Sequence, residues 1–221
     1  MSTSHESDPR LVVEGLSIKR FDGPAHRSAV LDLAATTLRL VEERERSQRA
    51  LVDPLTGLAN VAALAAELPR YQEHALASGD NYIVGFVDLN NVKSVNDLSE
   101  DHHSLGDEYI FTGSRAVRKT VYPTDKVYRV GGDEFIFFLP LQKEGSLGVE
   151  ELQQILQQRL ADGFEAEMIE SEGFASVSNI PLGLSLGLAL WNAAEGESFE
   201  LARSRADHEM YLHKQTSLNK T

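Results

Sequence analysis

The order of apolar strands and amphipathic helices after residue 80 limits the fold more than any other feature of the chain. The run NYIVGFVD at 81–88 has the continuous apolar character of a buried central strand and ends at an acid. Two further strands flank Gly131 and Gly132 as a predicted hairpin. The other patterns are KVYRV at 126–130 and DEFIFFLP at 133–140 in that hairpin, helices at 108–121, 146–161 and about 198–215, and an apolar strand at 181–190. We therefore expect a mixed α/β (α+β) domain.

This order also predicts which strands are neighbours. A right-handed crossover makes the first two strands parallel. The hairpin then returns the third strand antiparallel, and a ferredoxin-like arrangement, which is also that of a polymerase palm, inserts it between the first two. In that geometry Asp88, at the end of the first strand, lies beside Asp133 and Glu134 at the tip of the hairpin.

Three carboxylates at strand ends suit a hard cation, because magnesium takes oxygen ligands and keeps positions open for phosphate oxygens. Two such ions can hold both the attacking and the leaving oxygen of a displacement at phosphorus. Gly131 and Gly132 permit the turn and let a ligand approach the backbone without a Cβ in between, and Lys93 supplies a countercharge. Each feature alone is typical of a solvated turn, a strand end or a surface lysine. Their joint placement predicts metal-dependent phosphoryl or nucleotidyl transfer.

Composition excludes several other classes of protein. A formal net charge of −13 over 221 residues argues against a partner such as nucleic acid or an anionic membrane, since both require a basic surface. The chain has no cysteine, which removes disulfides, thiolate metal sites and cysteine nucleophiles. The polar start MSTSHESDPR lacks the pattern of a signal peptide, and the longest apolar run has 12 residues, too few to span a bilayer. We expect a cytoplasmic protein.

The first 50 residues read as an extension of the domain at 51–221. Residues 1–25 are polar and irregular, and from 27 to 52 a helical pattern places Val30, Leu33, Thr37, Leu40 and Val41 on one face. This segment is a linker helix, a short coiled coil or a solvated helix, and the heptads are too few to choose. In DPLTGLAN, at 53–60, Asp53 and Pro54 suit the cap and first turn of the next helix.

The segment RVGGDEF at 129–135 resembles the signature of the GGDEF family, the diguanylate cyclases of bacterial cyclic di-GMP signalling. Four other segments resemble motifs of the same family and occur in the family's order. They are DPLTGLAN at 53–60, FVDLNNVKSVND at 86–97, HSLGDEY at 103–109 and ADHEMYLHK at 206–214. Together the five cover about residues 51–215. The resemblance implies a ferredoxin-like or palm-like nucleotidyl cyclase fold, with a mostly antiparallel five-stranded sheet flanked by helices.

The resemblance also implies a reaction. Two GTP molecules condense to cyclic di-GMP and two pyrophosphates between the subunits of a homodimer, with two Mg²⁺ ions per site or Mn²⁺ in their place. The implied roles of this chain's residues fall into three sets. The metal ligands are Asp88, Asp133, Glu134 and the Leu89 carbonyl. The catalytic residues are Asp133 (base for the 3′-hydroxyl), Glu134 and Lys93. The substrate-binding residues are Asn96 and Asp107 at the guanine, Lys93 and Lys214 at the triphosphate, and His103, Gly132, Asn91 and Val92.

The departures from the family pattern keep a second class of function open. The basic residue expected four positions after Lys214 is Leu218, and the loop before His103 is about two residues longer than is common. The product-inhibition motif RxxD reads YPTD, so Tyr122 replaces the arginine while Asp125 remains. We expect no strong product inhibition, because tyrosine cannot offer a phosphate a charged fork. The alternative is a catalytically silent module that binds GTP or a regulatory protein partner; relaxed nucleotide choice is disfavoured by Asp107.

Overall fold

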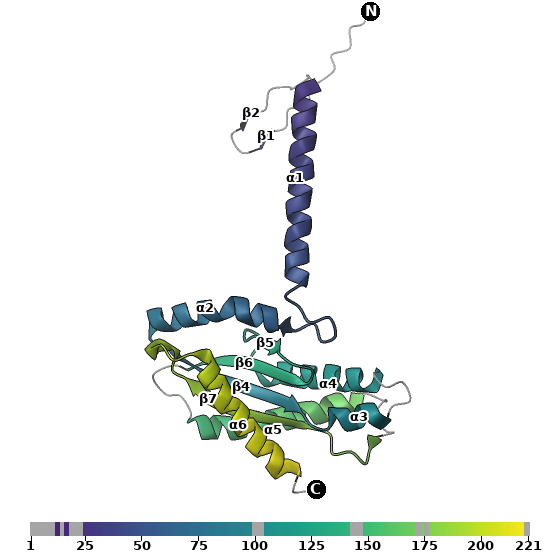
Figure 1. Ribbon diagram of the computed structural model, residues 1–221, viewed down its shortest axis with the longest axis vertical. Coiled ribbons are helices and arrows are strands. Elements are labelled where there is room, and N and C mark those ends of the chain that lie inside the picture. Colours follow the sequence, from purple (N-terminus) through teal and green to yellow (C-terminus); the bar gives the residue numbers. More distant parts are fainter. Residues whose placement is uncertain are drawn as a thin grey trace, which may run out of the picture. The chain divides into compact units, whose positions relative to one another are not determined.

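The computed structural model describes residues 12–13, 16–17, 24–98, 104–141, 148–170, 174 and 177–218 (Figure 1). The chain divides into two units, Met1–Gln48 and Arg49–Thr221. The first contains β1 (Val12–Val13), β2 (Leu16–Ser17) and most of α1 (Pro24–Arg49). The second contains β3 (Ala59–Asn60), α2 (Val61–Ser78), β4 (Asn81–Leu89), α3 (Val92–Leu98), α4 (Ser104–Thr120), β5 (Val127–Arg129), β6 (Glu134–Leu141), α5 (Val149–Glu170), β7 (Leu184–Trp191), the 3₁₀ helix η2 (Ala193–Glu195) and α6 (Phe199–Leu218).

The N-terminal helix expected over 27–52 is present as α1, three residues earlier at each end. Its large apolar side chains are exposed, with 63% of Val30, 68% of Leu33 and 61% of Leu40 accessible. The helix therefore buries no core of its own in a single chain. None of the helices within the described ranges is long and apolar enough to cross a membrane.

The sheet of the second unit has the strand order β3-β5-β6-β4-β7. β6 pairs antiparallel with β4 on one side and with β5 on the other, and β7 pairs antiparallel with the free side of β4. The hairpin strand thus lies between the two strands that precede it, which confirms the predicted ferredoxin-like topology. Only the short β3, which pairs with β5, adds a parallel neighbour. β4 is an interior strand, between β6 and β7, because its residues are apolar toward both faces.

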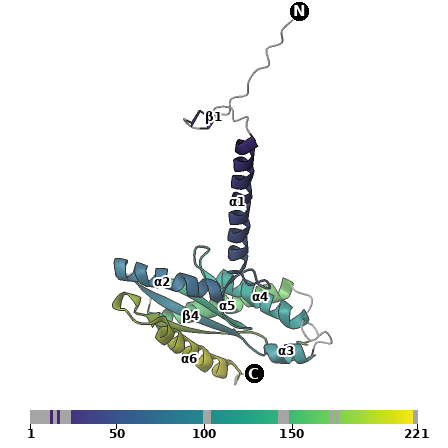
Figure 2. The ribbon, with the colours of Figure 1, turned by 45° about the horizontal axis from the view of Figure 1, so that its top comes forward.

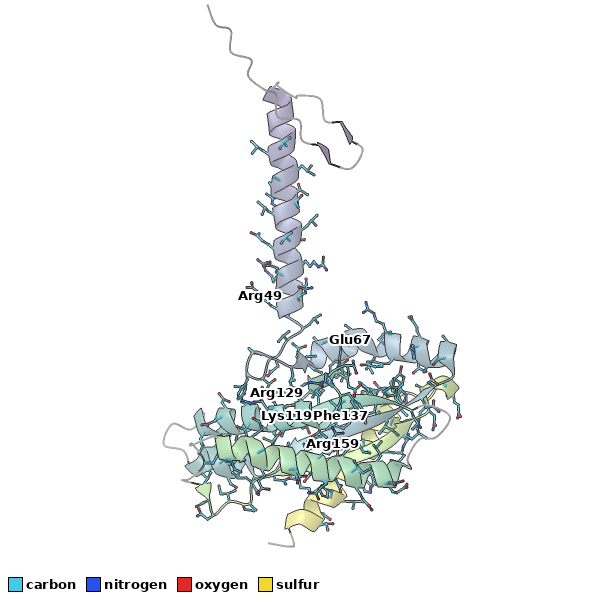
Figure 3. The ribbon with its side chains drawn as sticks, turned by 180° about the vertical axis from the view of Figure 1, so that it is seen from behind. Arg49, Glu67, Lys119, Arg129, Phe137 and Arg159 are labelled. Atoms are coloured by element: carbon cyan, nitrogen blue, oxygen red, sulfur yellow. The ribbon has the colours of Figure 1, made fainter. Side chains whose placement is uncertain are left out.

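Each face of the sheet carries its own core, and Figure 2 shows the helices that cover the sheet. On one face Val87 and Phe137 pack with Leu156 and Leu160 of α5 and with Val117 of α4. On the other face the core holds residues from β4, β6, β7, α2 and α6: Tyr82, Val84, Phe86, Ile136, Phe138, Trp191, Leu64, Ala202 and Met210, among others. Figure 3 views the domain from the α5 side, with Phe137 labelled. Alternate residues of one strand therefore serve opposite layers.

Three local expectations are wrong. Asp53 does not cap a helix: its Oδ1 accepts the Thr56 N–H inside a turn, and Asn60 caps α2 by accepting the N–H groups of Ala62 and Ala63. No helix was expected between the strand at 81–88 and the helix at 108–121, yet Val92–Leu98 forms α3, which its apolar i, i+3 spacing (Val92 and Val95) favours. The turn between β5 and β6 covers 130–133 rather than the two glycines alone.

Candidate active site

Three acidic residues are backbone neighbours at one end of the β4–β6 strand pair. Asp88 of β4 lies directly opposite Glu134 of β6 in the antiparallel register. The Leu89 N–H donates to the Asp133 carbonyl at 3.1 Å, so the residue before β6 is held against the last residue of β4. The sheet therefore brings together the residues that were predicted to share this edge, and the burial of β4 and β6 holds them in place.

The electrostatics of this edge are those of crowded negative charge. Burial raises the pKa of the Asp88 carboxyl, and the charges of Asp133 and Asp207 raise it further, while an ion pair with Lys214 opposes both effects. Burial likewise raises the pKa of Glu134, together with the charges of Asp133 and Asp88. Lys214, from α6, thus contacts the acidic edge, while its role at the triphosphate stays a prediction.

The donor set fits a hard divalent cation, because it consists of carboxylate oxygens with no sulfur or imidazole among them. It is not a preformed metal cage. Within the ranges that the structure describes, no three acidic or histidine side chains are grouped so that they could hold an ion. The Asp88 carboxylate instead contacts the Lys214 ammonium.

The turn that precedes β6 is shaped by its neighbours. A Cβ on Gly131 would lie 2.3 Å from Glu134 Oε2, so the glycine leaves room for that carboxylate, whereas a Cβ on Gly132 would meet nothing within 4 Å. Neither glycine adopts a positive φ. The open side of Gly132 agrees with the expected approach of a ligand to the backbone. The turn is closed by the Val130 N–H, which donates to the Glu134 carbonyl at 2.9 Å.

Arg129 ties this turn to the segment that enters the domain. Its guanidinium donates to the Gly132 carbonyl from Nη2 at 2.6 Å and to both carboxylate oxygens of Asp53 from Nη1, at 2.9 and 3.1 Å. Figure 3 labels Arg129. Asn60 extends the connection, because its Nδ2 donates to the Ala50 carbonyl at 2.8 Å. The motif around Asp53 thus supports the turn at 130–133 as well as the start of α2.

The two residues expected at the guanine base, Asn96 and Asp107, lie on α3 and α4. Asn96 of α3 packs so closely against α4 that a Cβ on Gly106 would lie 1.8 Å from its Oδ1. Asp107 follows Gly106 directly and is exposed, as is Lys93 on α3. The structure therefore places Asn96 beside the residue that precedes Asp107, which suits a shared role at one base.

Asn91, just before α3, is expected near the phosphates, and its conformation is fixed by its backbone and by a side-chain hydrogen bond. Asn91 has a φ of 59°, in the left-handed region, and its Nδ2 donates to the Pro181 carbonyl at 2.9 Å. Asparagine is one of the few residues that adopt this conformation at low cost. Val92 follows as the first residue of α3.

For some of the expected residues the structure gives no position within the site. His103 lies outside the described residues, and Leu218 is the last residue of α6. At the position of the expected product-inhibition motif, the Tyr122 N–H donates to the Asp125 carboxylate at 3.0 Å, and Arg118 binds the carbonyls of both residues. The Asp125 carboxylate therefore stabilises the turn at 122–125, in which Asp125 itself lies.

Three residues near the site were not singled out by their sequence pattern. Tyr109 of α4 is fully buried and its hydroxyl contacts Asn90, the residue after Leu89. Ser185 of β7 is buried and donates to the Asn90 side chain at 3.0 Å. Arg203 of α6 lies 5.9 Å from the centre of the Phe86 ring and attracts the Glu134 carboxylate. Tyr109 stands inside the segment HSLGDEY, and that position was its only signal in the sequence.

A ferredoxin-like domain with an acidic edge, a neighbouring lysine and an Asn–Asp pair on adjoining helices has the architecture of a nucleotidyl cyclase. The chain belongs to the family described as diguanylate cyclase, GGDEF domain, whose model matches residues 50–220. This confirms the resemblance seen in the sequence motifs.

Comparison with individual proteins agrees with that family. The chain is 29% identical over 194 residues to diguanylate cyclase DosC of Escherichia coli K12, across 88% of this chain and 39% of that protein. It is 32% identical over 139 residues to cyclic di-GMP phosphodiesterase NbdA of Pseudomonas aeruginosa, across 63% of this chain and 17% of that protein. It therefore spans less than half the length of either relative. The coiled coil and GGDEF domain of DgcB from Caulobacter crescentus, solved with c-di-GMP, shares the fold with a TM-score of 0.69 at 24% identity, covering 87% of this chain and 95% of that one.

Proposed function

We propose that this chain is a diguanylate cyclase, which joins two GTP molecules into cyclic di-GMP with release of two pyrophosphates. The observation that carries the proposal is the pairing of Asp88 with Glu134 in register, with Asp133 hydrogen-bonded beside them. Membership of the GGDEF family supports the same reaction. The chain covers only part of the length of its relatives. The activity of the whole protein is therefore proposed together with that of this chain.

Mg²⁺, or Mn²⁺ in its place, would be held by Asp88, Asp133, Glu134 and the Leu89 carbonyl. When bound, the cation offsets phosphate charge and lowers the pKa of the 3′-hydroxyl. Asp133 then accepts the proton of that hydroxyl. Lys214 exchanges its contact with Asp88 for the triphosphate.

The guanine end of the substrate is read by α3 and α4. Asp107 accepts hydrogen bonds from guanine N1–H and N2–H₂ but meets an acceptor at adenine N1, so it selects GTP over ATP. Asn96, which lies against Gly106, binds the same base from the neighbouring helix. Lys93 on α3 faces the triphosphate, and the backbone amides around Asn91 and Val92 contact phosphate oxygens.

Each site holds one GTP, so the reaction needs a second copy of the chain. The exposed apolar stripe of α1, formed by Val30, Leu33 and Leu40, supports pairing of two chains through this helix. A regulatory protein that changes this pairing would control the rate. Product inhibition at the 122–125 turn is weak, because Tyr122 offers no guanidinium and the Asp125 carboxylate already binds the Tyr122 N–H.

The test is direct synthesis. We expect the purified chain, incubated with GTP and Mg²⁺ at high protein concentration, to form cyclic di-GMP detectable by mass spectrometry. Asp133→Ala should abolish the product without changing the circular dichroism spectrum. Asp80→Ala, just before the other end of β4, is the matched control and should remain active.

A catalytically silent module is the second candidate. The relative NbdA, named as a cyclic di-GMP phosphodiesterase, favours it, as does Leu218 where a basic residue is expected. Equal silence of wild type and Asp133→Ala, together with measurable GTP binding, would establish this second function in place of the first.

A further inference from the structure

Tyr109 is a buried residue for which neither the family motifs nor the proposed reaction supplies a role. It lies on α4, two residues after Asp107, and its side chain is fully inaccessible. Its ring packs edge-on against Phe164 and Phe174, with both ring centres 5.9 Å away. These contacts would be equally good with phenylalanine. The hydroxyl therefore needs a separate explanation.

That hydroxyl joins two loops at the end of the sheet. The hydroxyl oxygen lies 2.9 Å from the Asn90 carbonyl oxygen and 3.0 Å from the Gly183 carbonyl oxygen, which share its single proton as acceptors, and it accepts the Gly183 N–H at 2.9 Å. The Asn90 N–H in turn donates to the Gly183 carbonyl at 2.9 Å. Burial raises the pKa of Tyr109 far above its ordinary value, so the hydroxyl keeps its proton and remains a donor.

A second buried hydroxyl holds the same residue. Ser185, which lies opposite Asp88 in the β4–β7 register, donates to Asn90 Oδ1 at 3.0 Å. Asn90 is thus held at its N–H, its carbonyl and its side chain by groups from α4, from β7 and from the residue that precedes β7. Asn90 is only 6% exposed, and it lies between Asp88 and the left-handed Asn91.

The peptide that precedes Asn90 contains the carbonyl of Leu89, one of the proposed metal ligands. Its direction depends on the Leu89 N–H, which is bound to Asp133, and on Asn90, which is bound as described. The Leu89 side chain also packs so closely on α4 that a Cβ on Gly113 would lie 2.8 Å from its Cδ2. Metal ligands need such supporting contacts to keep their donor atoms aimed.

We propose that Tyr109 and Ser185 are positioning residues for the metal-binding loop, because they clamp Asn90 and so direct the Leu89 carbonyl toward the cation. This rests on the proposed function, since the loop has a metal to bind only if the site takes GTP with Mg²⁺. Neither residue touches the substrate. Their effect is on how readily the loop binds the cation, and the reading of guanine by Asp107 is left unchanged.

The test measures binding with no turnover. A non-hydrolysable GTP analogue is titrated into the full chain by calorimetry over a series of Mg²⁺ concentrations. Tyr109→Phe keeps the ring and removes only the hydroxyl. We expect the Mg²⁺ concentration for half-maximal analogue binding to rise about fivefold, the equivalent of one net hydrogen bond. Ser185→Ala should shift it in the same direction, and provides the test by itself if Tyr109→Phe does not fold.

Tyr82→Phe is the matched control. Tyr82 is buried on the same strand as Asp88, and its hydroxyl is bound to His74, near the opposite end of β4. This variant loses an equivalent hydroxyl and should keep the wild-type Mg²⁺ dependence. The second control is the ratio of affinities for the GTP and inosine triphosphate analogues, which differ only at the guanine 2-amino group. The ratio should be the same in wild type and in Tyr109→Phe.

The outcomes separate the two proposals. Analogue binding by wild type with an unchanged Mg²⁺ midpoint in both Tyr109→Phe and Ser185→Ala would overturn the clamp and leave the proposed function standing. A shift of equal size in Tyr82→Phe, or a changed inosine ratio, would overturn it as well, because either shows general loosening of the domain. Absence of analogue binding by wild type at any Mg²⁺ concentration would overturn both proposals.

Discussion

Replacing Arg129 by methionine removes four hydrogen bonds, two to Gly132 in the turn at 130–133 and two to Asp53 at the entrance of the domain. The methionine keeps most of the aliphatic stem, so packing changes little. The Asp53 carboxylate loses its positively charged partner. The Gly132 carbonyl loses two hydrogen-bond donors, Nε and Nη2. Both members of the ion pair are mostly buried, with 13% of Arg129 and 15% of Asp53 exposed.

The expected cost follows from that burial. A hydrogen bond to a charged group contributes about 1.5–3 kcal/mol, and breaking a buried ion pair costs about 3–5 kcal/mol. Asp53 keeps its donors from Thr56, so the carboxylate is not left bare. We expect Arg129→Met to lower the free energy of unfolding by about 2–3 kcal/mol, which lowers the melting temperature by about 4–12 °C in a domain of this size.

Urea unfolding at matched protein concentration measures this loss. Lys126→Met is the control, because Lys126 lies just before the same strand and also makes an ion pair, with Glu67 at 2.6 Å, but is 55% exposed. It should cost less than about 1 kcal/mol. Equal unfolding midpoints for the two variants would refute the claim that the Asp53–Arg129 pair supports the turn.

The same pair makes stability depend on pH. Burial alone would raise the pKa of the Asp53 carboxyl, but hydrogen bonds from Thr56 and Arg129 outweigh it and hold the pKa below the ordinary value of 3.8. A carboxyl with a lowered pKa in the folded state stabilises the protein above its ordinary pKa, and this stability is lost as pH falls through the folded value. The difference in unfolding free energy between wild type and Asp53→Asn should therefore narrow below pH 3.8.

Three further predictions concern substrate, product and assembly. Gly106→Ala displaces Asn96, because the new Cβ would lie 1.8 Å from its Oδ1, and should raise KM for GTP at least about tenfold with little change in melting temperature. Initial rates should be unaffected by micromolar cyclic di-GMP in wild type and become sensitive to it in Tyr122→Arg, since the arginine supplies the missing fork. Leu33→Glu combined with Leu40→Glu should shift the chain toward monomer in sedimentation and raise the protein concentration needed for activity; an unchanged dependence would contradict pairing through α1.

Strand order was predictable because each signal is local and the rules that join the elements are few. The apolar run before Asp88 and the hairpin around the glycines left one ferredoxin-like arrangement, and it is the arrangement found. The meeting of Asp88 with Glu134 followed from topology alone. The three carboxylates predicted a cation, and the five motifs then added GTP as the expected substrate, which no pattern of burial could supply.

The features that were missed depend on tertiary contacts. Asp53 has the sequence signal of a helix cap, yet Arg129, distant in the chain, engages it in a different role. Tyr109 was marked in the sequence only by its place in the segment HSLGDEY, and only the approach of Asn90 and Gly183 gives its hydroxyl a function to propose. The ion pair between Lys214 and Asp88 is another contact that the sequence did not predict. Two motifs contain these residues, but neither motif indicates that they touch.

The end of β4 shows why one strand can serve a site with several parts. Side chains alternate across the sheet, so Asp88 faces the layer of α6, where Lys214 meets it, and Leu89 enters the opposite core beside α4. Two consecutive residues thus contact the helix that carries the lysine and the helix that carries Asp107. A one-residue slip of β4 against β6 would exchange these faces and separate Asp88 from both Glu134 and Lys214. The long apolar pairing of β4 with β6 and β7 prevents that slip, so the register of the central strands is itself a requirement of the proposed chemistry.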